Sequence, residues 1–498
     1  MASAPPLTIR NLTSTSIELK LLERFEAPGS LDSKFGIANI TKNITAIVNQ
    51  SSNSSAPQLA ANAQPFSHQD VNIRSDVFQT TKTDIALTEK SPVEVLRLTF
   101  ENDGERHRLD LPPASNASTE LIPLTPNPRF HYTAVFLPQF SHLSLFSSAN
   151  LSSWMQELRD DTPLSALSIP GTHNSPTHHR ALPSVRCQAV SPREQLDNGV
   201  RFFDIRVQPE TPEDPTKDGL LLVHSVFPIS LTGNKYFRDL VNDVFAFLDA
   251  HPSETVVMSV KREGTGNATD AQLSRILRDH YAGDVNHWFT APRIPSLGES
   301  RHKIVLIRRF ALEDNLNKEW DGAGWCIDAS TWADNTPNAT CPSGDVCVQD
   351  FYEVMDTENI DKKLQFAEAH LERAASCVCA LPGTGLATQS APGQPPPQPP
   401  PKQPFFINFL SASNFWKVGC WPEKIAAKLN PAVVDFLCRR HNETEGIGGF
   451  DGGEGRREVG DGSTGIVVCD WVGAGGDWDL VRCIVGMNAK LENRERGA

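Results

Sequence analysis

Short runs of alternating hydrophobic and polar residues occupy the first 150 positions of the chain. Gly, Pro, Asn and Ser separate these runs, and no helical period is sustained. The runs lie at 16–22, 44–48, 93–100, 107–111, 131–137 and 142–146. Short strands separated by turn residues are typical of a β-sandwich. The pattern therefore predicts a β-sandwich-like domain over 1–150, and it indicates no catalytic function for this domain.

After Trp154 the pattern changes to apolar strands that alternate with amphipathic helical segments. Eight candidate strands lie at 164–170, 201–207, 219–225, 255–260, 303–310, 346–354, 405–413 and 465–472. Helical candidates lie at 235–250, 270–282, 359–375, 422–440 and 478–491. Alternation of this kind is typical of βα architectures. Residues 151–498 are therefore predicted to form a distorted TIM (β/α)8 barrel.

Two segments interrupt the barrel pattern. Residues 385–404 are rich in Pro and Gln and are predicted to form an extended loop, which could bind an SH3-like partner. Residues 445–465 are rich in Gly and charged residues and match no P-loop pattern. Both segments are expected to lie outside the barrel core.

The composition restricts the partners and the location of the protein. The 498-residue chain has a formal net charge of −14 at pH 7, which argues against a nucleic-acid partner because such proteins concentrate Lys and Arg. No run of about 18 apolar residues is present, and the opening MASAPPLTIRNLTSTS lacks the apolar region of a signal peptide. These features predict a cytoplasmic or peripheral membrane protein, and they leave transient contact with a membrane surface open.

Ten cysteines are scattered along the chain, and the close pairs are Cys341/Cys347 and Cys377/Cys379. Neither pair has histidines at the spacing of a zinc site. The cysteines are therefore predicted to be free thiols, with a Cys341–Cys347 disulfide as the alternative.

Polar side chains lie at or after the end of every candidate strand, where the active-site groups of a βα barrel are found. Among them are His173, Asn174, Asp204, Arg206, His224, Lys261, Arg309, Asp350, Tyr352 and Asp470. One such residue alone is more often a structural group. Acids, bases and cations on all eight strands favour an active site, because unpaired buried charge is costly. Two histidines can act as general base and acid, and arginine can bind phosphate bidentately, so the set predicts phosphodiester cleavage.

Residues 161–262 and 304–491 resemble the X-type catalytic domain of phosphatidylinositol-specific phospholipases C, and the small bacterial enzymes more than the calcium-dependent signalling ones. The motifs that carry the resemblance are IPGTHNS, SPREQLDNGVRFFDIRV, LLVHSVF, HPSETVVMSVKRE, KIVLIRRF, VQDFY, FFINFLSAS and GIVVCDWV. The resemblance implies a hydrolase of lipid metabolism that cleaves an inositol phospholipid to a cyclic inositol phosphate and diacylglycerol. It implies no cofactor and no calcium ion.

The resemblance also implies a role for each matching residue. His173 would be the general base that takes the proton of the inositol 2-hydroxyl, and Asp470 would orient it. His224 would be the general acid that protonates the diacylglycerol oxygen. Arg206 would stabilise the charge on the phosphorane-like transition state, and Asp204 would hold Arg206 or His224 in place.

The substrate-binding residues and two departures from the family follow from the same resemblance. Groups that would bind the inositol ring are Lys261, Arg309, Asp350 and Tyr352, the last as a stacking face. Asn174 stands where bacterial members usually have Asp, which implies weaker support for His224. Arg206 stands where calcium-dependent members have an acidic residue, and a fixed cation there would repel a metal ion.

Two other functions compete with this interpretation. A metal-dependent glycerophosphodiesterase or sphingomyelinase-D-like enzyme also uses two histidines, but it needs a Glu-x-Asp metal pair where this chain has Asp204-Ile205-Arg206. A catalytically inactive lipid- or protein-binding module is the other alternative. The presence of both histidines argues against it.

Overall fold

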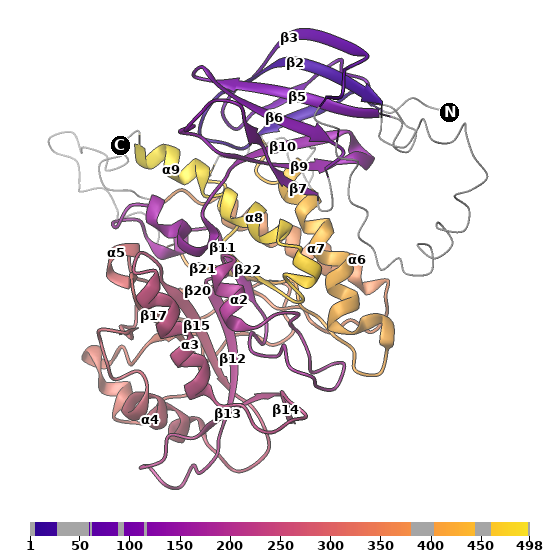
Figure 1. The fold of residues 1–498 in the computed structure, drawn as a ribbon. Coiled ribbons are helices and arrows are strands. Elements are labelled where there is room, and N and C mark those ends of the chain that lie inside the picture. Colours follow the sequence, from indigo (N-terminus) through magenta and orange to yellow (C-terminus); the bar gives the residue numbers. More distant parts are fainter. Residues whose placement is uncertain are drawn as a thin grey trace, which may run out of the picture. The chain divides into compact units, whose positions relative to one another are not determined.

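The computed structural model describes residues 5–26, 59, 62–87, 94–113, 117–379, 403–443 and 460–496. The chain divides into two compact units, Met1–Ser148 and Ala149–Ala498. In Figure 1 they are coloured indigo to purple and magenta to yellow. The candidate strand at 44–48, residues 385–402 of the Pro-rich segment and residues 445–459 of the Gly-rich segment lie outside the described residues.

Two five-stranded sheets make up the N-terminal unit. The first has the order β4-β1-β10-β9-β7, formed by Thr8–Asn11 (β1), Thr80–Lys82 (β4), Ser118–Glu120 (β7), Tyr132–Leu137 (β9) and His142–Ser147 (β10). The second has the order β3-β2-β5-β6-β8, formed by Ile17–Glu26 (β2), Ser67–Ser75 (β3), Glu94–Asn102 (β5), Glu105–Leu111 (β6) and Ile122–Pro123 (β8). All candidate strands that fall on described residues coincide with one of these strands.

Buried side chains from both sheets form one hydrophobic cluster. Leu98 and Phe100 of β5 belong to the cluster, and so do Leu143 and Leu145 of β10. In β6 the residues alternate between buried and more exposed positions, as expected of a strand that turns one face to a core. The alternating pattern in the sequence is thus the pattern that buries one face of each sheet.

The C-terminal unit is built on a curled sheet of twelve strands with helices around it. Parallel strands follow one another across this sheet in the order β17-β15-β12-β11-β22-β21-β20. Their bounds are Ile169–Thr172 (β11), Phe202–Pro209 (β12), Val256–Arg262 (β15), Ile304–Arg309 (β17), Val346–Gln349 (β20), Phe405–Phe409 (β21) and Ile466–Cys469 (β22). The first and last of them in sequence, β11 and β22, pair with each other, which brings the two ends of this unit's sequence together in one sheet.

The third candidate strand, 219–225, is not a parallel barrel strand, and this prediction is wrong. It forms β13, Leu220–His224, which pairs antiparallel with β12 and continues into β14, Phe227–Pro228. Parallel strands need a crossover of about a dozen or more residues, usually helical, and the connection 210–219 contains no helix. Two-residue strands complete the sheet: Trp288–Phe289 (β16), Ile327–Asp328 (β18) and Ala339–Thr340 (β19).

Four helices agree with predicted segments, and the fifth predicted segment, 478–491, forms two helices. These helices are Phe237–Ala250 (α3), Asp270–His280 (α4), Asn359–Ala375 (α6), Pro422–Arg439 (α7), Asp479–Gly486 (α8) and Ala489–Arg496 (α9). Two short helices, Pro192–Asp197 (α2) and Leu297–Ser300 (α5), were not predicted. In α3 the buried side chains Leu240, Val244 and Phe247 recur every three to four residues, which is the spacing that places them on one face. The unit is therefore a mixed α/β fold.

Close packing between β11, β12 and β15 fixes the position of β11, the strand that precedes His173. A Cβ atom added to Gly171 in β11 would lie 2.9 Å from the Phe202 Cβ atom in β12, so only glycine fits there. Behind these strands, Arg201 donates to Glu254 Oε2 over 2.9 Å, and both side chains are fully buried. A paired buried charge is tolerated because each ion satisfies the other. These contacts fix the strand that leads into His173.

All ten cysteines lie in the described part of the chain and are free thiols. The prediction of free thiols is confirmed. The alternative disulfide is not formed, because Cys341 and Cys347 are both buried free thiols. Within the described ranges no helix has the length and apolar character needed to cross a membrane.

Candidate active site

The structure brings most of the predicted site residues together at one end of the parallel strands. Hydrogen bonds, ion pairs or ring contacts join His173, Asn174, Asp204, Arg206, His224, Arg309, Asp350 and Asp470 into one group. Lys261 joins the group through Glu263. Tyr352 does not contact this group directly, because its hydroxyl donates to Asp334 instead, at 3.0 Å.

His173 is oriented by a buried carboxylate. Its Nδ1 atom lies 2.9 Å from Asp470 Oδ1, and its side chain is 15% exposed, which leaves the ring reachable from one side. Burial opposes the charged form of the ring, but the Asp470 carboxylate and the Cys187 sulfur outweigh it and raise the pKa of His173 well above its ordinary value. With Nδ1 held by Asp470, Nε2 is the atom available for proton transfer.

Asp204 is a fully buried carboxylate that holds two arginines and one backbone group. It accepts from Arg206 Nε at 3.2 Å, from Arg309 Nη1 at 3.3 Å and from the backbone N–H of Asn174 at 3.1 Å. Burial alone would raise the pKa of Asp204, but the guanidinium groups of Arg206 and Arg309 outweigh it and lower the pKa below its ordinary range. Asp204 therefore stays ionised and holds Arg206 in place. Holding Arg206 is one of the two roles predicted for Asp204, the other being to hold His224.

A second carboxylate, Glu263, holds the other side of Arg206. Glu263 Oε1 pairs with Arg206 Nη1 and lies 3.1 Å from Lys261 Nζ, while Oε2 accepts from the backbone N–H of Ser225 at 2.8 Å. Burial would raise the pKa of Glu263, but Arg206 and Lys261 outweigh it and lower the pKa to about 2. Ser225 follows His224, so Glu263 also ties the β13 turn to the arginine.

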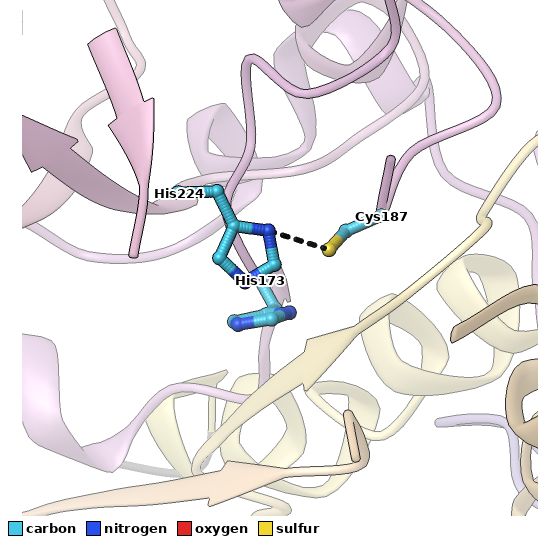
Figure 2. Close-up of side chains that lie close together, drawn as sticks. All are labelled: His173, Cys187 and His224. Carbon is cyan, nitrogen blue, oxygen red and sulfur yellow. Dashed lines mark hydrogen bonds between the residues drawn. The ribbon is translucent and has the colours of Figure 1, made fainter. Parts of the chain in front are cut away.

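His224 lies next to His173, with ring centroids 5.9 Å apart and ring planes perpendicular. Its Nδ1 atom lies 3.0 Å from the backbone oxygen of Val185 and 3.8 Å from the Cys187 sulfur. Figure 2 shows the thiol of Cys187 pointing at the His224 ring, with His173 beside that ring. Burial opposes the charged form, but Cys187 and the Val185 carbonyl outweigh it and raise the pKa of His224.

The Asn174 side chain does not lie next to His224, as its predicted role requires. Its Nδ2 atom lies 3.1 Å from His173 Nε2, and no contact between its side chain and His224 is found among the described residues. Asn174 has a φ of 42°, a left-handed conformation that Asn tolerates better than most residues. The amide therefore lies on the His173 side of the site, and the neighbours of His224 are Val185 and Cys187.

A flat cationic surface lies beside the two histidines. The Arg309 guanidinium stacks on the Trp332 ring, 3.4 Å from its centroid, and Trp332 Nε1 donates to Asp350 Oδ2 at 3.2 Å. Burial lowers the pKa of Arg309, and neighbouring Arg206 acts in the same direction. Burial also raises the pKa of Tyr352, to about 12, so this phenol stays neutral.

Sequence reasoning missed Cys187, Glu263 and Trp332. Glu263 could have been predicted, because Glu263 lies two residues after Lys261 and alternate residues of a strand share one face. Cys187 and Trp332 lie in long connections, where no periodicity indicates which side chain returns to the site. Cys187 is also part of the group of metal-ligating side chains that the described residues contain, with His173 and His224.

Two adjacent histidines, with two arginines bound to the same carboxylate of this group, suit the cleavage of a phosphodiester. The comparisons with known proteins name the family. Residues 161–310 match the family model "Phosphatidylinositol-specific phospholipase C, X domain". The resemblance predicted from the motifs is therefore confirmed for this segment.

Curated relatives agree with this family. The chain is 31% identical over 173 residues to a 1-phosphatidylinositol phosphodiesterase of Listeria monocytogenes, covering 32% of this chain and 50% of the relative. It is 27% identical over 252 residues to the protein of the same name from Staphylococcus aureus, covering 47% and 73%. The chain thus spans half the length of the first relative and about three quarters of the second. A solved phosphatidylinositol-specific phospholipase C from Staphylococcus aureus is 23% identical, covering 68% of this chain and 97% of that one with a TM-score of 0.49.

Proposed function

We propose that this chain is a phosphatidylinositol-specific phospholipase C, which cleaves an inositol phospholipid to a cyclic inositol phosphate and diacylglycerol. The observation that carries the proposal is the pair of rings His173 and His224, 5.9 Å apart, with Asp470 bound to the first. Arg206 is bound by Asp204, whose Oδ2 atom lies 4.0 Å from His173 Nε2. The names of the curated relatives support the same reaction.

In the proposed reaction His173 Nε2 takes the proton of the inositol 2-hydroxyl, and the resulting oxygen attacks the phosphorus. The bond between phosphorus and the diacylglycerol oxygen breaks, and His224 gives that oxygen its proton. Arg206 offsets the negative charge that grows on the non-bridging oxygens, because it is held by Asp204 and Glu263 before the substrate arrives. The raised pKa of His224 suits an acid that must start protonated.

The substrate-binding part of the proposal assigns the inositol hydroxyls to Lys261, Arg309 and Asp350. Lys261 is about one third exposed, whereas Arg309 and Asp350 are nearly buried next to Trp332. Asn174 Nδ2 donates to His173 Nε2, so it would release this contact when the 2-hydroxyl arrives. Tyr352 follows Asp350 by two residues in the sequence and is proposed as the stacking face for the inositol ring.

We propose that the reaction needs no calcium ion. Arg206 supplies a fixed positive charge where a calcium-dependent enzyme would need an acidic ligand, and it is already paired with two carboxylates. Two carboxylates that hold a guanidinium have no free oxygens for a hard cation. The same site favours this function over the metal-dependent glycerophosphodiesterase alternative.

We also propose that apolar side chains after β21 contact the lipid surface. Trp416 is 89% exposed, Val418 is exposed, and Phe415 stacks on Phe227 at 6.2 Å. Phe227 follows His224 by three residues and Phe415 follows the end of β21, so these side chains lie at the strand ends that carry the site. Exposed aromatic groups of this kind mark interaction surfaces, and Trp suits a membrane interface.

A Trp416→Ala variant tests this contact. We expect less binding to phosphatidylinositol vesicles and a larger loss of turnover on vesicles than on a soluble inositol phosphodiester. Trp320→Ala is the matched control, because Trp320 is also exposed but adjoins Glu319, which pairs with Arg278 in the last turn of α4. Equal losses in both variants would contradict the membrane role.

The overall architecture enters the proposal as well. We propose that the C-terminal unit is a distorted (β/α)8-type barrel with an antiparallel third strand, supported by the parallel order that brings β11 next to β22. We propose that the N-terminal unit is a β-sandwich, supported by the hydrophobic cluster that both of its sheets share.

One experiment tests the proposed function directly. Turnover of a fluorogenic inositol phosphodiester is measured for the wild type and for His173→Ala and His224→Ala. Each positioned acid or base contributes about 10²–10⁴-fold, so both variants should lose turnover while still binding a phosphonate substrate analogue. Activity that survives in both variants would refute the proposal.

A further inference from the structure

Three side chains of the site could together hold a metal ion. His173, Cys187 and His224 each offer one ligand atom, and these atoms lie within 4.8 Å of one another. Figure 2 shows the sulfur of Cys187 directed at the His224 ring and the His173 ring next to it. The proposed phosphodiester cleavage transfers protons through the two histidines and gives Cys187 no proton transfer of its own.

Two imidazoles and a thiolate are the ligand set of a thiophilic divalent ion. Zinc binds Cys sulfur at about 2.3 Å and His nitrogen at about 2.0 Å in tetrahedral geometry, which puts sulfur and nitrogen about 3.5 Å apart. The Cys187 sulfur is 3.8 Å from His224 Nδ1, so a small movement of the two side chains would give the sulfur–nitrogen separation of a zinc site. Calcium and magnesium prefer oxygen ligands. The ligand set therefore selects zinc or a similar ion over the hard cations.

The surroundings of the three ligands support binding. Asp470 holds Nδ1 of His173 at 2.9 Å and leaves Nε2 free to face an ion, as the carboxylate of a carboxylate–histidine–metal arrangement does. Cys187 is fixed by its neighbours: its backbone oxygen accepts from Trp471 at 2.8 Å, and Gln188 Nε2 donates to the backbone oxygen of His173 at 2.7 Å. The thiol is thus held next to both histidines.

Other contacts oppose binding and keep it weak. His224 Nδ1 would have to give up the Val185 backbone oxygen at 3.0 Å, and the Asn174 amide would have to leave His173 Nε2. The guanidinium groups of Arg206 and Arg309, both bound to Asp204, add positive charge beside the site. The lost contacts and the nearby positive charge weaken the affinity for an ion. The site is therefore occupied reversibly, when the concentration of the ion is high.

We propose that His173, Cys187 and His224 form a reversible binding site for zinc or another thiophilic divalent ion, which excludes substrate by occupying both histidines. The ion replaces the thiol proton of Cys187 and the protons that His173 Nε2 and His224 Nδ1 carry, and these protons are released to solvent. Ion binding stands on the geometry alone. The inhibition rests on the proposed function, because it requires that His173 and His224 carry out catalysis.

Cobalt(II) titration of the EDTA-treated full chain tests the binding. We expect one equivalent of cobalt to give a thiolate-to-cobalt charge-transfer band, and Cys187→Ala to abolish it. Cys326→Ala is the matched control, because Cys326 is also a buried free thiol, and it should keep the band. X-ray absorption of the zinc-loaded wild type needs no variant: it should show one sulfur neighbour at about 2.3 Å, and a zinc shell without sulfur would overturn the proposal.

Turnover of the soluble inositol phosphodiester tests the inhibition. Zinc should inhibit the wild type, and Cys187→Ala should need at least about tenfold more zinc for the same relative inhibition, because one of three ligands is lost. If the wild type shows the Cys187-dependent cobalt band but no turnover, the proposed function fails and the metal site stands. If it turns over substrate but shows no such band, or if both proteins are equally sensitive to zinc, the metal site is refuted.

Discussion

Replacing Asp470 by Asn removes one charge from the base side of the site and keeps the shape of the side chain. Asp470 Oδ1 accepts from His173 Nδ1 at 2.9 Å, and both side chains are largely buried. A hydrogen bond to a charged group contributes about 1.5–3 kcal/mol, and about 1.36 kcal/mol equals a factor of ten in rate. If the whole bond acts in the transition state, the variant loses about 10- to 150-fold in plateau turnover.

The pH profile separates this effect from a merely structural one. Asp470 raises the pKa of His173, and a general base must be neutral to act. Turnover of the wild type should therefore rise with pH through a value above the ordinary histidine pKa. Asp470→Asn lowers the His173 pKa, so the acidic limb of its profile should move to lower pH while its plateau falls.

The assay is kcat/KM for the soluble inositol phosphodiester from pH 5 to 9, in EDTA, with circular dichroism as a check on folding. Asp461→Asn is the matched control, because Asp461 is also a buried carboxylate, paired with Arg494 outside the site. It should keep the position of the acidic limb. A folded Asp470→Asn variant with an unmoved limb and an unchanged plateau would refute the assignment of Asp470 to His173.

The remaining predictions concern metal dependence, the Asn174 position and the buried ion pair. Activity should survive chelation by EDTA, because Arg206 supplies the charge at the phosphate; full loss with rescue by calcium or magnesium would revive the glycerophosphodiesterase alternative. Asn174→Asp should move the acidic limb of kcat/KM to higher pH, since the new carboxylate would lie beside His173 Nε2, 3.1 Å from the present amide; an unmoved limb would contradict this placement. Glu254→Gln should lower the free energy of unfolding by about 3–5 kcal/mol in urea, because it leaves Arg201 buried without its counter-charge. Asp197→Asn in the exposed pair with Arg193 should change it by less than about 1 kcal/mol.

Much of the fold could be predicted because, for most elements, the hydrophobic period and the length of the run indicated the same type of element. The α3, α4, α6 and α7 helices have sustained 3.6-residue patterns, and the buried strands β15, β17 and β22 are short apolar runs whose length and content of Val and Ile indicate strands. The error at 219–225 has a physical cause. An apolar run indicates a strand but not its direction, and the direction depends on the connection before it.

The His173 side of the site could be predicted because its residues lie on or directly after neighbouring parallel strands. His173 and Asp470 follow β11 and β22, Asp204 and Arg206 lie within β12, and β11 pairs directly with both β12 and β22. Neighbouring parallel strands bring their carboxyl ends to one edge, so their terminal side chains meet whatever the loops do. The family motifs then only had to assign the roles.

The acid side depends on a loop, and for that reason its composition could not be predicted. The sequence led to the expectation that Asn174 supports His224, but the neighbours of His224 are the Val185 oxygen and the Cys187 sulfur. Both belong to the connection between β11 and α2, whose path is set by distant contacts such as that of Trp471 with the Cys187 backbone. A carboxylate next to His224 would favour its charged form and offer a metal ion an oxygen, whereas the Cys187 thiol favours the charged form and offers a sulfur. The neighbours that raise the pKa of His224 would therefore also make the activity sensitive to thiophilic ions, and the wild-type turnover of this site should be highest in the presence of a chelator.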